Sequence, residues 1–563
     1  MKLFIGVFIQ TLLLTTATFG QTDELASYVN KLQSTITTVQ SGSKNYEQKI
    51  TTSQPAVILY SYDETDQKGN KVVHSYEFNL ADIDPYAVRE QTQKDLIQVV
   101  LAVRNKQKLV KVIKNNDVQS YDDQVAIIAK DIDNARAISE IVKKAIPPAE
   151  KITSGRLKLS GYDAMVTWLC SNVKNVSTSG KSITQTLVKS NHPGEMVFTQ
   201  TETDEKGSNE EQYSFNLADI NVNTIAFKVS GNKLGINFET LQKARYIAVK
   251  KNKETKPYVN DITISTNSVD EARDLKNVFT LAAPLALEKV KADMNGLSSE
   301  KAALEKVKSL AGEINLNTKQ VSQSFDANCY TTFTQNEKDP KKTEKNTYQF
   351  NFMDLNPAAN EIEVMGEKMF VRLVINNKKK LIQHTTDDKL SGYDDDIKIY
   401  MPDIESARRM KFAADQAAEK CKASYKEPYG GDVHALATWL ASSIKEVTLG
   451  DVTIKQALEP VESGNDNKLK FTTKEINSKG TGAEEVYEFS LSDLNPLSVD
   501  IEVKGKWLFV SVETELKGKI IKYYKDSKIQ PYASKISFVA SNTEETRSVS
   551  GALKKVITGL KKK

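Results

Sequence analysis

The chain has 563 residues, enough for about three to five domains at the usual size of about 100 to 200 residues each. Apolar residues make up 39% and charged residues 27%, which suits packed cores and excludes a protein with many membrane spans. The 77 basic and 73 acidic side chains leave a net charge of +4, too small over this length to indicate nucleic-acid binding.

The first twenty residues have the pattern of a signal peptide. Lys2 precedes an apolar run that ends at Leu14, and small or hydroxylated residues follow up to Gly20. An apolar run of about a dozen residues is too short to span a bilayer. We therefore predict cleavage before Gln21 and export to the periplasm or the exterior, with no membrane span in the mature chain.

The chain contains three cysteines, which could be free or partly paired. Cys170, Cys329 and Cys421 are an odd number in an exported chain, and none belongs to a CxxC motif. We expect three buried free thiols, because free cysteine is among the most buried residue types. One disulfide plus one free thiol is the alternative.

One segment occurs four times along the chain. A Tyr-x-Phe sequence recurs at intervals of 135 to 139 residues, and in every copy an Asp follows the Tyr after 6 residues, a second Tyr after 45 and an Arg after 60. These positions are Tyr76, Asp82, Tyr121 and Arg136; Tyr213, Asp219, Tyr258 and Arg273; Tyr348, Asp354, Tyr393 and Arg408; and Tyr487, Asp493, Tyr532 and Arg547.

The repeat length indicates tandem domains. A solenoid unit takes about 20–50 residues, whereas this period has the length of an independent domain. We predict a signal peptide over residues 1–20 and four modules over residues 21–150, 158–292, 297–425 and 430–563.

Within a module the periodicity predicts the elements in order. An apolar stripe at helical spacing opens each copy, as from Trp168 to Val173. Alternating segments such as Tyr76–Leu80 follow, and their short connections favour an antiparallel meander of about six strands. A helix-capping residue and an amphipathic helix close each copy; the caps are Asp131, Ser268, Asp403 and Asn542. The predicted fold class is α+β, with four tandem repeats of helix, meander and C-terminal helix.

This order of elements resembles the pleckstrin-homology-like superfold, in which a C-terminal helix closes a strand meander. The short leader ending in Phe19-Gly20-Gln21, and the presence of only ten arginines among 77 basic residues, resemble exported proteins of Bacteroidota-type bacteria that have no assigned function. The resemblance implies the fold of the module and export, and it implies no ligand.

The shared Asp and Arg could form one pair per module that binds a charged ligand group. We favour a structural role, in which the Asp caps a turn and the Arg pairs with a carboxylate or lies on the sheet. The second Tyr could stack on a sugar, but a buried ring with a hydrogen-bonded hydroxyl is the more usual arrangement.

We predict no catalytic, cofactor or metal site. His74, His192, His384 and His434 lie at unrelated module positions, and none belongs to an HExxH motif. The acidic run at residues 394–396 lacks the spacing of an EF-hand loop. The sequence contains no GxSxG motif and no phosphate-binding loop.

Two classes of function remain. The first is an exported, non-catalytic repeat protein that binds an envelope or extracellular ligand (polysaccharide, peptidoglycan or a protein partner) or acts as a multivalent scaffold. The alternative is a hydrolase, or an accessory subunit of an enzyme, with a site in one divergent module.

The linkers predict which modules are coupled. Pro147-Pro148 and the glycines of residues 155–161 separate the first two modules, and Lys426–Gly431 separates the last two. Residues 289–310 lack proline and favour a nearly continuous helix. We therefore expect hinges near residues 155 and 430 and a rigid connection between modules two and three.

Overall fold

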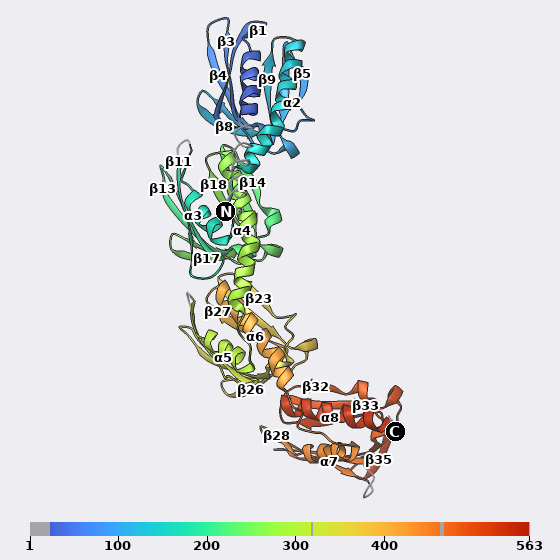
Figure 1. The fold of residues 1–563 in the computed structure, drawn as a ribbon. Coiled ribbons are helices and arrows are strands. Elements are labelled where there is room, and N and C mark those ends of the chain that lie inside the picture. Colours follow the sequence, from blue (N-terminus) through green and yellow to red (C-terminus); the bar gives the residue numbers. More distant parts are fainter. Residues whose placement is uncertain (1–22, 179–180, 317–318, 462–466, 562–563) are drawn as a thin grey trace, which may run out of the picture. The chain divides into compact units, whose positions relative to one another are not determined.

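The computed structural model describes residues 23–561 except 179–180, 317–318 and 462–466 (Figure 1). The predicted signal peptide lies outside the described residues. Within them, no helix combines the length and apolar character needed to cross a membrane. The chain divides into two compact units, Met1–Asp293 and Met294–Lys563, and each unit holds two modules.

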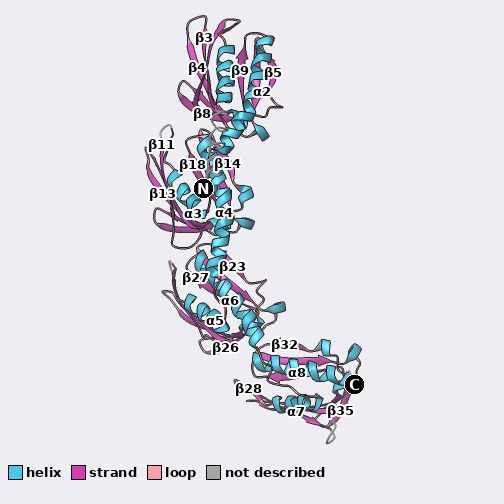
Figure 2. Ribbon diagram, in the orientation of Figure 1, coloured by secondary structure: helices cyan, strands magenta, loops and turns pink. Residues whose placement is uncertain are grey.

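The fold is α+β with four tandem repeats, as predicted, and Figure 2 shows that each repeat contains both strands and helices. Each repeat contains two antiparallel sheets, of six and three strands, where the sequence indicated one meander. The chain leaves the large sheet after its fourth strand, at a short 3-10 turn, and pairs two strands elsewhere before it returns. The ninth strand then joins those two.

In module one, residues 23–35 are helical. The large sheet runs β1 (Val39–Ser41), β2 (Lys44–Gln54), β3 (Val57–Asp66), β4 (Lys71–Asn79), β7 (Val110–Lys114) and β8 (Asp117–Asp122), and the small sheet runs β5 (Arg89–Gln93), β6 (Leu96–Ala102) and β9 (Gln124–Ala129). The turn η1 (Leu80–Asp82) ends β4, and α2 (Ile132–Gly155) closes the module.

Module two begins with α3 (Tyr162–Asn172). Its large sheet runs β10 (Val176–Thr178), β11 (Lys181–Lys189), β12 (Glu195–Asp204), β13 (Gly207–Asn216), β16 (Ile247–Lys251) and β17 (Glu254–Val259), and its small sheet runs β14 (Ala226–Ser230), β15 (Lys233–Glu239) and β18 (Asp261–Thr266). The helix α4 (Val269–Met294) closes it.

Module three begins with α5 (Glu300–Leu310). Its large sheet runs β19 (Glu313–Leu316), β20 (Lys319–Phe325), β21 (Tyr330–Lys338), β22 (Thr343–Asn351), β25 (Ile382–Thr386) and β26 (Lys389–Asp394), and its small sheet runs β23 (Glu361–Met365), β24 (Lys368–Val374) and β27 (Asp396–Met401). The turn η6 (Phe352–Asp354) ends β22, and α6 (Ile404–Ser424) closes the module.

Module four begins with α7 (Val433–Ser443). Its large sheet runs β28 (Val447–Leu449), β29 (Val452–Pro460), β30 (Lys468–Asn477), β31 (Gly480–Ser490), β34 (Ile521–Lys525) and β35 (Lys528–Ala533), and its small sheet runs β32 (Asp500–Lys504), β33 (Trp507–Glu513) and β36 (Lys535–Ala540). The turn η8 (Leu491–Asp493) ends β31, and α8 (Thr543–Lys561) closes the module.

A glutamine in every module fastens the two sheets together. Its side-chain amide, on the second strand of the large sheet, donates to a backbone carbonyl of the last strand of the small sheet. The four bonds are Gln48 to Ile128 at 3.0 Å, Gln185 to Ser265 at 3.0 Å, Gln323 to Tyr400 at 2.9 Å and Gln456 to Val539 at 2.5 Å. These bonds hold the edge of the core closed around the apolar residues of both sheets.

The linker predictions are wrong. The α4 helix ends at Met294 and α5 begins at Glu300, because Gly296 has a φ of +127° and Ser299 caps the new helix by accepting from the backbone N–H of Ala302. Conversely, α2 continues through Pro147-Pro148 to Gly155. Modules one and two form one compact unit, and modules three and four form the other, so the division falls where a rigid connection was expected.

Candidate functional site

The repeated Asp and the repeated Arg lie at two different turns of each module. Each C-terminal helix begins at a capped turn; for example, Asp131 accepts from the N–H of Asn134, and Asp403 from that of Ser406. An acidic residue in the first turn and the repeated Arg are three residues apart, so both lie on one side of the helix. The repeated Asp ends the 3-10 turn after the fourth strand.

In the first unit, the Arg of module two pairs with the Asp of module one. Arg273 Nη2 lies 2.5 Å from Asp82 Oδ2, and the same guanidinium contacts Asp270. The Asn79 amide of module one donates to Asp270 Oδ1 at 3.1 Å. The side chains of Arg273 and Asp82 are only 12% and 13% exposed, so the pair is held inside the junction.

A second guanidinium reinforces this junction. Arg156, just after α2, places Nη1 2.9 Å from Asp270 Oδ2 and Nη2 2.5 Å from Asp274 Oδ2. Two arginines and three carboxylates thus form one network across modules one and two. The side chain of Val269, at the start of α4, adds an apolar contact by packing against the core of module one.

The second unit repeats the pairing. Arg547 of module four donates from Nε to Asp354 Oδ1 of module three at 3.2 Å, and its two other nitrogens reach Asp354 Oδ2 and Glu544. The Asn351 amide donates to both carboxylate oxygens of Glu544 at 3.2 Å. The ring of Tyr425 lies 6.0 Å from the guanidinium carbon of Arg547.

The pKa shifts of the paired residues reflect the burial of both Asp–Arg pairs. Burial raises the pKa of the Asp82 and Asp354 carboxyls above the ordinary value, and the facing arginine opposes that rise in each case. Burial alone would lower the pKa of Arg547, but Asp354 and Glu544 together raise it. The junctions are therefore places where charge has been taken out of water and paired.

The other members of these two sets differ in exposure. Arg136 of module one is 68% exposed, and its ion pair among the described residues is with Asp133 on its own helix, at 3.2 Å. Asp493 of module four is exposed. Asp219 is buried in module two, and Arg408 Nε lies 3.8 Å from Glu405 Oε2 on its own helix. The structure therefore shows pairs between consecutive modules, at Asp82–Arg273 and Asp354–Arg547, where we had considered pairs within each module.

The first repeated Tyr belongs to a pair of rings across two strands. In each module it lies opposite an aromatic residue of the third strand, with ring centroids 5.8 to 6.1 Å apart. The pairs are Tyr60–Tyr76, Phe198–Tyr213, Phe333–Tyr348 and Phe471–Tyr487. Such pairs stabilise a sheet, which accounts for the repeated Tyr without a ligand.

The second repeated Tyr is buried in three modules. Tyr121, Tyr258 and Tyr393 are at most 8% exposed, and burial raises the pKa of Tyr121 and Tyr393 to about 12. Tyr532 differs, since it is 45% exposed.

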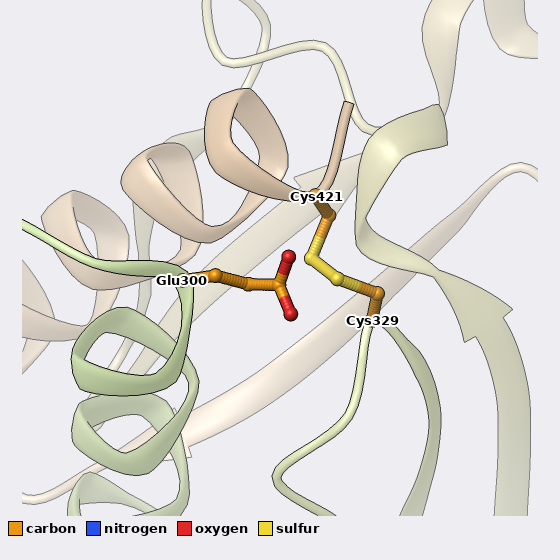
Figure 3. Close-up of side chains that lie close together, drawn as sticks. All are labelled: Glu300, Cys329 and Cys421. Atoms are coloured by element: carbon orange, nitrogen blue, oxygen red, sulfur yellow. A yellow bond between two sulfur atoms is a disulfide. The ribbon is translucent and has the colours of Figure 1, made fainter. Parts of the chain in front are cut away.

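The expectation of three free thiols is wrong. Cys329 and Cys421 form a disulfide, with Cα atoms 5.6 Å apart, and Cys170 is free (Figure 3). The fold brings the segment before β21 against the end of α6, although the two cysteines are 92 residues apart in the sequence. The carboxylate of Glu300 lies beside the disulfide. Sulfur atoms bonded to each other are not thiolate ligands, and a disulfide fits an oxidising compartment.

A groove of about 330 Å³ lies between modules one and two. Its lining combines amides, hydroxyls, two amines and one carboxylate with a few apolar side chains. The described lining residues are Lys111, Asn116, Asp117, Val118, Tyr121, Val176, Ser177, Ile183, Asn232, Lys233, Leu234, Ser265, Thr266 and Asn267. Tyr121 is the only member of the repeat signature among them.

Some of these residues had a sequence signal and some had none. Asn79 and Asn351 stand three residues after the repeated Tyr, as does Asn216, so their spacing could have indicated a shared role. Arg156 and the groove residues Asn116 and Asn232 follow no such pattern.

Comparisons with protein-family models, curated proteins and solved structures find no match for the chain.

Proposed function

We propose that the mature chain is an exported, non-catalytic repeat protein that binds a polysaccharide or peptidoglycan strand in the groove between modules one and two. The remaining modules then act as a scaffold that presents this groove. The observation that carries the proposal is the chemistry of the groove lining, because the two buried Asp–Arg pairs are engaged in the junctions and the first repeated Tyr of each module is accounted for by a ring pair.

The groove lining carries hydrogen-bonding groups that suit the many hydroxyl groups of a polysaccharide. Asn116 and Asn232 carry amides with both donors and acceptors, and neither side chain has a hydrogen-bond partner among the described residues. Ser177, Ser265 and Thr266 add hydroxyls. The aliphatic lining residues Val118, Val176, Ile183 and Leu234 would contact the less polar face of a sugar ring.

The acid–base content of the groove supports binding without catalysis. Asp117 is the only carboxylate among the described lining residues. Glycoside hydrolysis generally uses two carboxylates on opposite sides of the scissile bond, and the groove supplies one.

Export and the finer family resemblance are parts of the same proposal. The predicted leader and the Cys329–Cys421 disulfide support an oxidising, extracytoplasmic setting. The closing helix after the sheets supports the likeness to pleckstrin-homology-like modules, and the composition supports the likeness to Bacteroidota-type exported proteins.

The test is calorimetric titration of the mature protein with soluble peptidoglycan fragments and a panel of bacterial polysaccharides. We expect Asn116→Ala and Asn232→Ala each to weaken binding by about tenfold, since one lost hydrogen bond costs about 1 kcal/mol or slightly more. Asp388→Ala and Lys506→Ala alter the equivalent positions of modules three and four and serve as matched controls. Unchanged binding in both groove variants, or binding of a protein in place of any glycan, would contradict the proposal.

A further inference from the structure

The junctions inside the chain use two complementary faces of a module. We call the start of the C-terminal helix, with its acidic residue and Arg, the donor face. We call the 3-10 turn, with its Asp and the neighbouring Asn amide, the acceptor face. Within each unit the acceptor face of one module receives the donor face of the next, as Asp82 receives Arg273 and Asp354 receives Arg547.

Two of these faces remain uncovered. On the donor face of module one, Arg136 is 68% and Asp133 is 86% exposed, whereas Arg273 and Asp270 of module two are 12% and 9% exposed. The acceptor face of module four likewise leaves Asp493 exposed, although Asp82 and Asp354 are each 13% exposed. Module one therefore has an open donor face, and module four has an open acceptor face.

An apolar residue shows the same difference. Ile132 of module one is 45% exposed at the start of its helix. Its equivalents are Val269, which packs against the core of module one, and Thr543, which is 1% exposed. An exposed isoleucine at this position indicates a contact surface without its partner.

The acceptor face of module four also has a side-chain amide, but a different residue supplies it. Ser490 stands where modules one and three have Asn79 and Asn351. Asn467 takes the same role in the turn, because its Oδ1 accepts from the N–H of Ser492 at 2.9 Å, as Asn79 Oδ1 accepts from Ala81 at 2.9 Å. The side-chain amide of Asn467 donates to Ser492 Oγ at 3.1 Å, so module four also places an amide beside its 3-10 turn.

We propose that mature chains associate head to tail, with the Asp493 face of one copy receiving the Arg136 face of the next. Arg136 would pair with Asp493, Asp133 would take the Asn467 amide, and Ile132 would be covered. The interface is heterologous, so each added copy again presents one open donor face and one open acceptor face. Growth therefore does not stop at a dimer.

The wild-type test is analytical ultracentrifugation of the mature chain from the low to the high micromolar range, at low and at high salt. We expect the average mass to rise with concentration beyond a dimer, and to fall when salt is added, because charged groups form the contact. A chain that remains a monomer or stops at a dimer would overturn the proposal.

Three variants locate the contact. Arg136→Glu and Asp493→Arg should each weaken association by at least about 30-fold, because each removes one partner of a desolvated pair. Lys143→Glu makes the same change of charge at an exposed site of the same helix and should leave association unchanged. Both exposed positions should tolerate substitution, and an unaltered melting temperature checks that the variants fold.

Mixing the first two variants gives the most specific result. The intact donor face of Asp493→Arg fits the intact acceptor face of Arg136→Glu, so the mixture should associate although neither variant does alone. If the mixture stays monomeric, or if Lys143→Glu weakens association as much as Arg136→Glu does, the proposal is wrong.

Discussion

The two described junctions hold the same Asp–Arg pair in different surroundings. Between modules one and two, Arg156 adds a second guanidinium that bridges Asp270 and Asp274. Between modules three and four, the ring of Tyr425 lies beside Arg547 instead. The pair is therefore the common part of the junction, and its neighbours have been exchanged without loss of the arrangement.

A second ion pair is present in modules one and four, with its two charges interchanged. Arg104 pairs with Glu150 in module one, where the closing helix passes the loop after β6, and at the equivalent positions of module four Glu515 pairs with Lys561. The charges are reversed while the contact is kept. Modules two and three have Leu241 with Leu287 and Asn376 with Lys422 at these positions, so the ion pair is a feature of modules one and four and not a requirement of the fold.

The largest expected difference between the units comes from the disulfide. Replacing Cys329 and Cys421 by Ser should lower the free energy of unfolding of the second unit by roughly 4 kcal/mol, because the bond closes a loop of 92 residues in the unfolded chain. Differential scanning calorimetry of the full chain should show one transition shifted down and one unchanged. A shift of both transitions would contradict the division into two units.

Removal of the repeated Arg at a junction should destabilise the unit that contains it. Arg273→Ala and Arg547→Ala should each destabilise their own unit by about 3 kcal/mol, because a buried carboxylate is left without its partner. Hydrogen exchange should increase at the turns that carry Asp82 and Asp354. Arg136→Ala, at the exposed equivalent position, is the matched control.

Loss of the additional arginine should affect the first unit alone. Arg156→Ala should cost about 1 to 2 kcal/mol, since Asp270 keeps Arg273 and Asn79 as partners. The corresponding change in the second unit, Tyr425→Ala, should cost about 1 kcal/mol or less. Equal losses from the two substitutions would show that the neighbours of the pair matter in the same way.

The stability of the second unit at low pH should depend on the protonation of Glu502. Burial tends to raise the pKa of Glu502, but hydrogen bonds from Lys535, Ser511 and Lys504 outweigh it and lower the pKa to about 2. Because the folded pKa is depressed, the stabilisation is present above about pH 4.5 and is lost as the pH falls toward 2. Lys228 stands at the equivalent position of module two, so the part of the acid response that is due to Glu502 belongs to the second unit and should be absent in Glu502→Gln.

The smallest effect is expected at the open donor face. Arg136→Ala should change the free energy of unfolding of the first unit by less than about 0.5 kcal/mol, because exposed ion pairs contribute little. Thermal unfolding of dilute protein measures this. A loss comparable to that of Arg273→Ala would mean that Arg136 is engaged within its own copy.

Local patterns predicted local structure well. The alternation around Tyr76 and its equivalents located the fourth strand, and the caps at Asp131 and Asp403 located the closing helices, because both depend on neighbouring residues. The Gln hydrogen bond between the two sheets was not predicted, because Gln48, Gln323 and Gln456 stand at unequal distances before the repeated Tyr.

Long-range partners were beyond the sequence. A constant spacing between Asp and Arg shows that both matter in every module, but it does not show whether Asp82 meets Arg136 or Arg273. The disulfide between Cys329 and Cys421 belongs to one module and has no repeated counterpart to indicate it. The linkers misled for a physical reason, since Pro147 and Pro148 are accommodated within a helix whose far end is held by the Arg156 network.

The most direct test of the account is a double-mutant cycle on Asp354 and Arg547 in the full chain. Asp354→Asn, Arg547→Gln and the double variant would be compared by hydrogen exchange at the first turn of α8. The account predicts a coupling energy of about 1 to 3 kcal/mol between two residues that belong to different modules. Additive effects of the two substitutions would show that the repeated Asp and Arg do not join one module to the next.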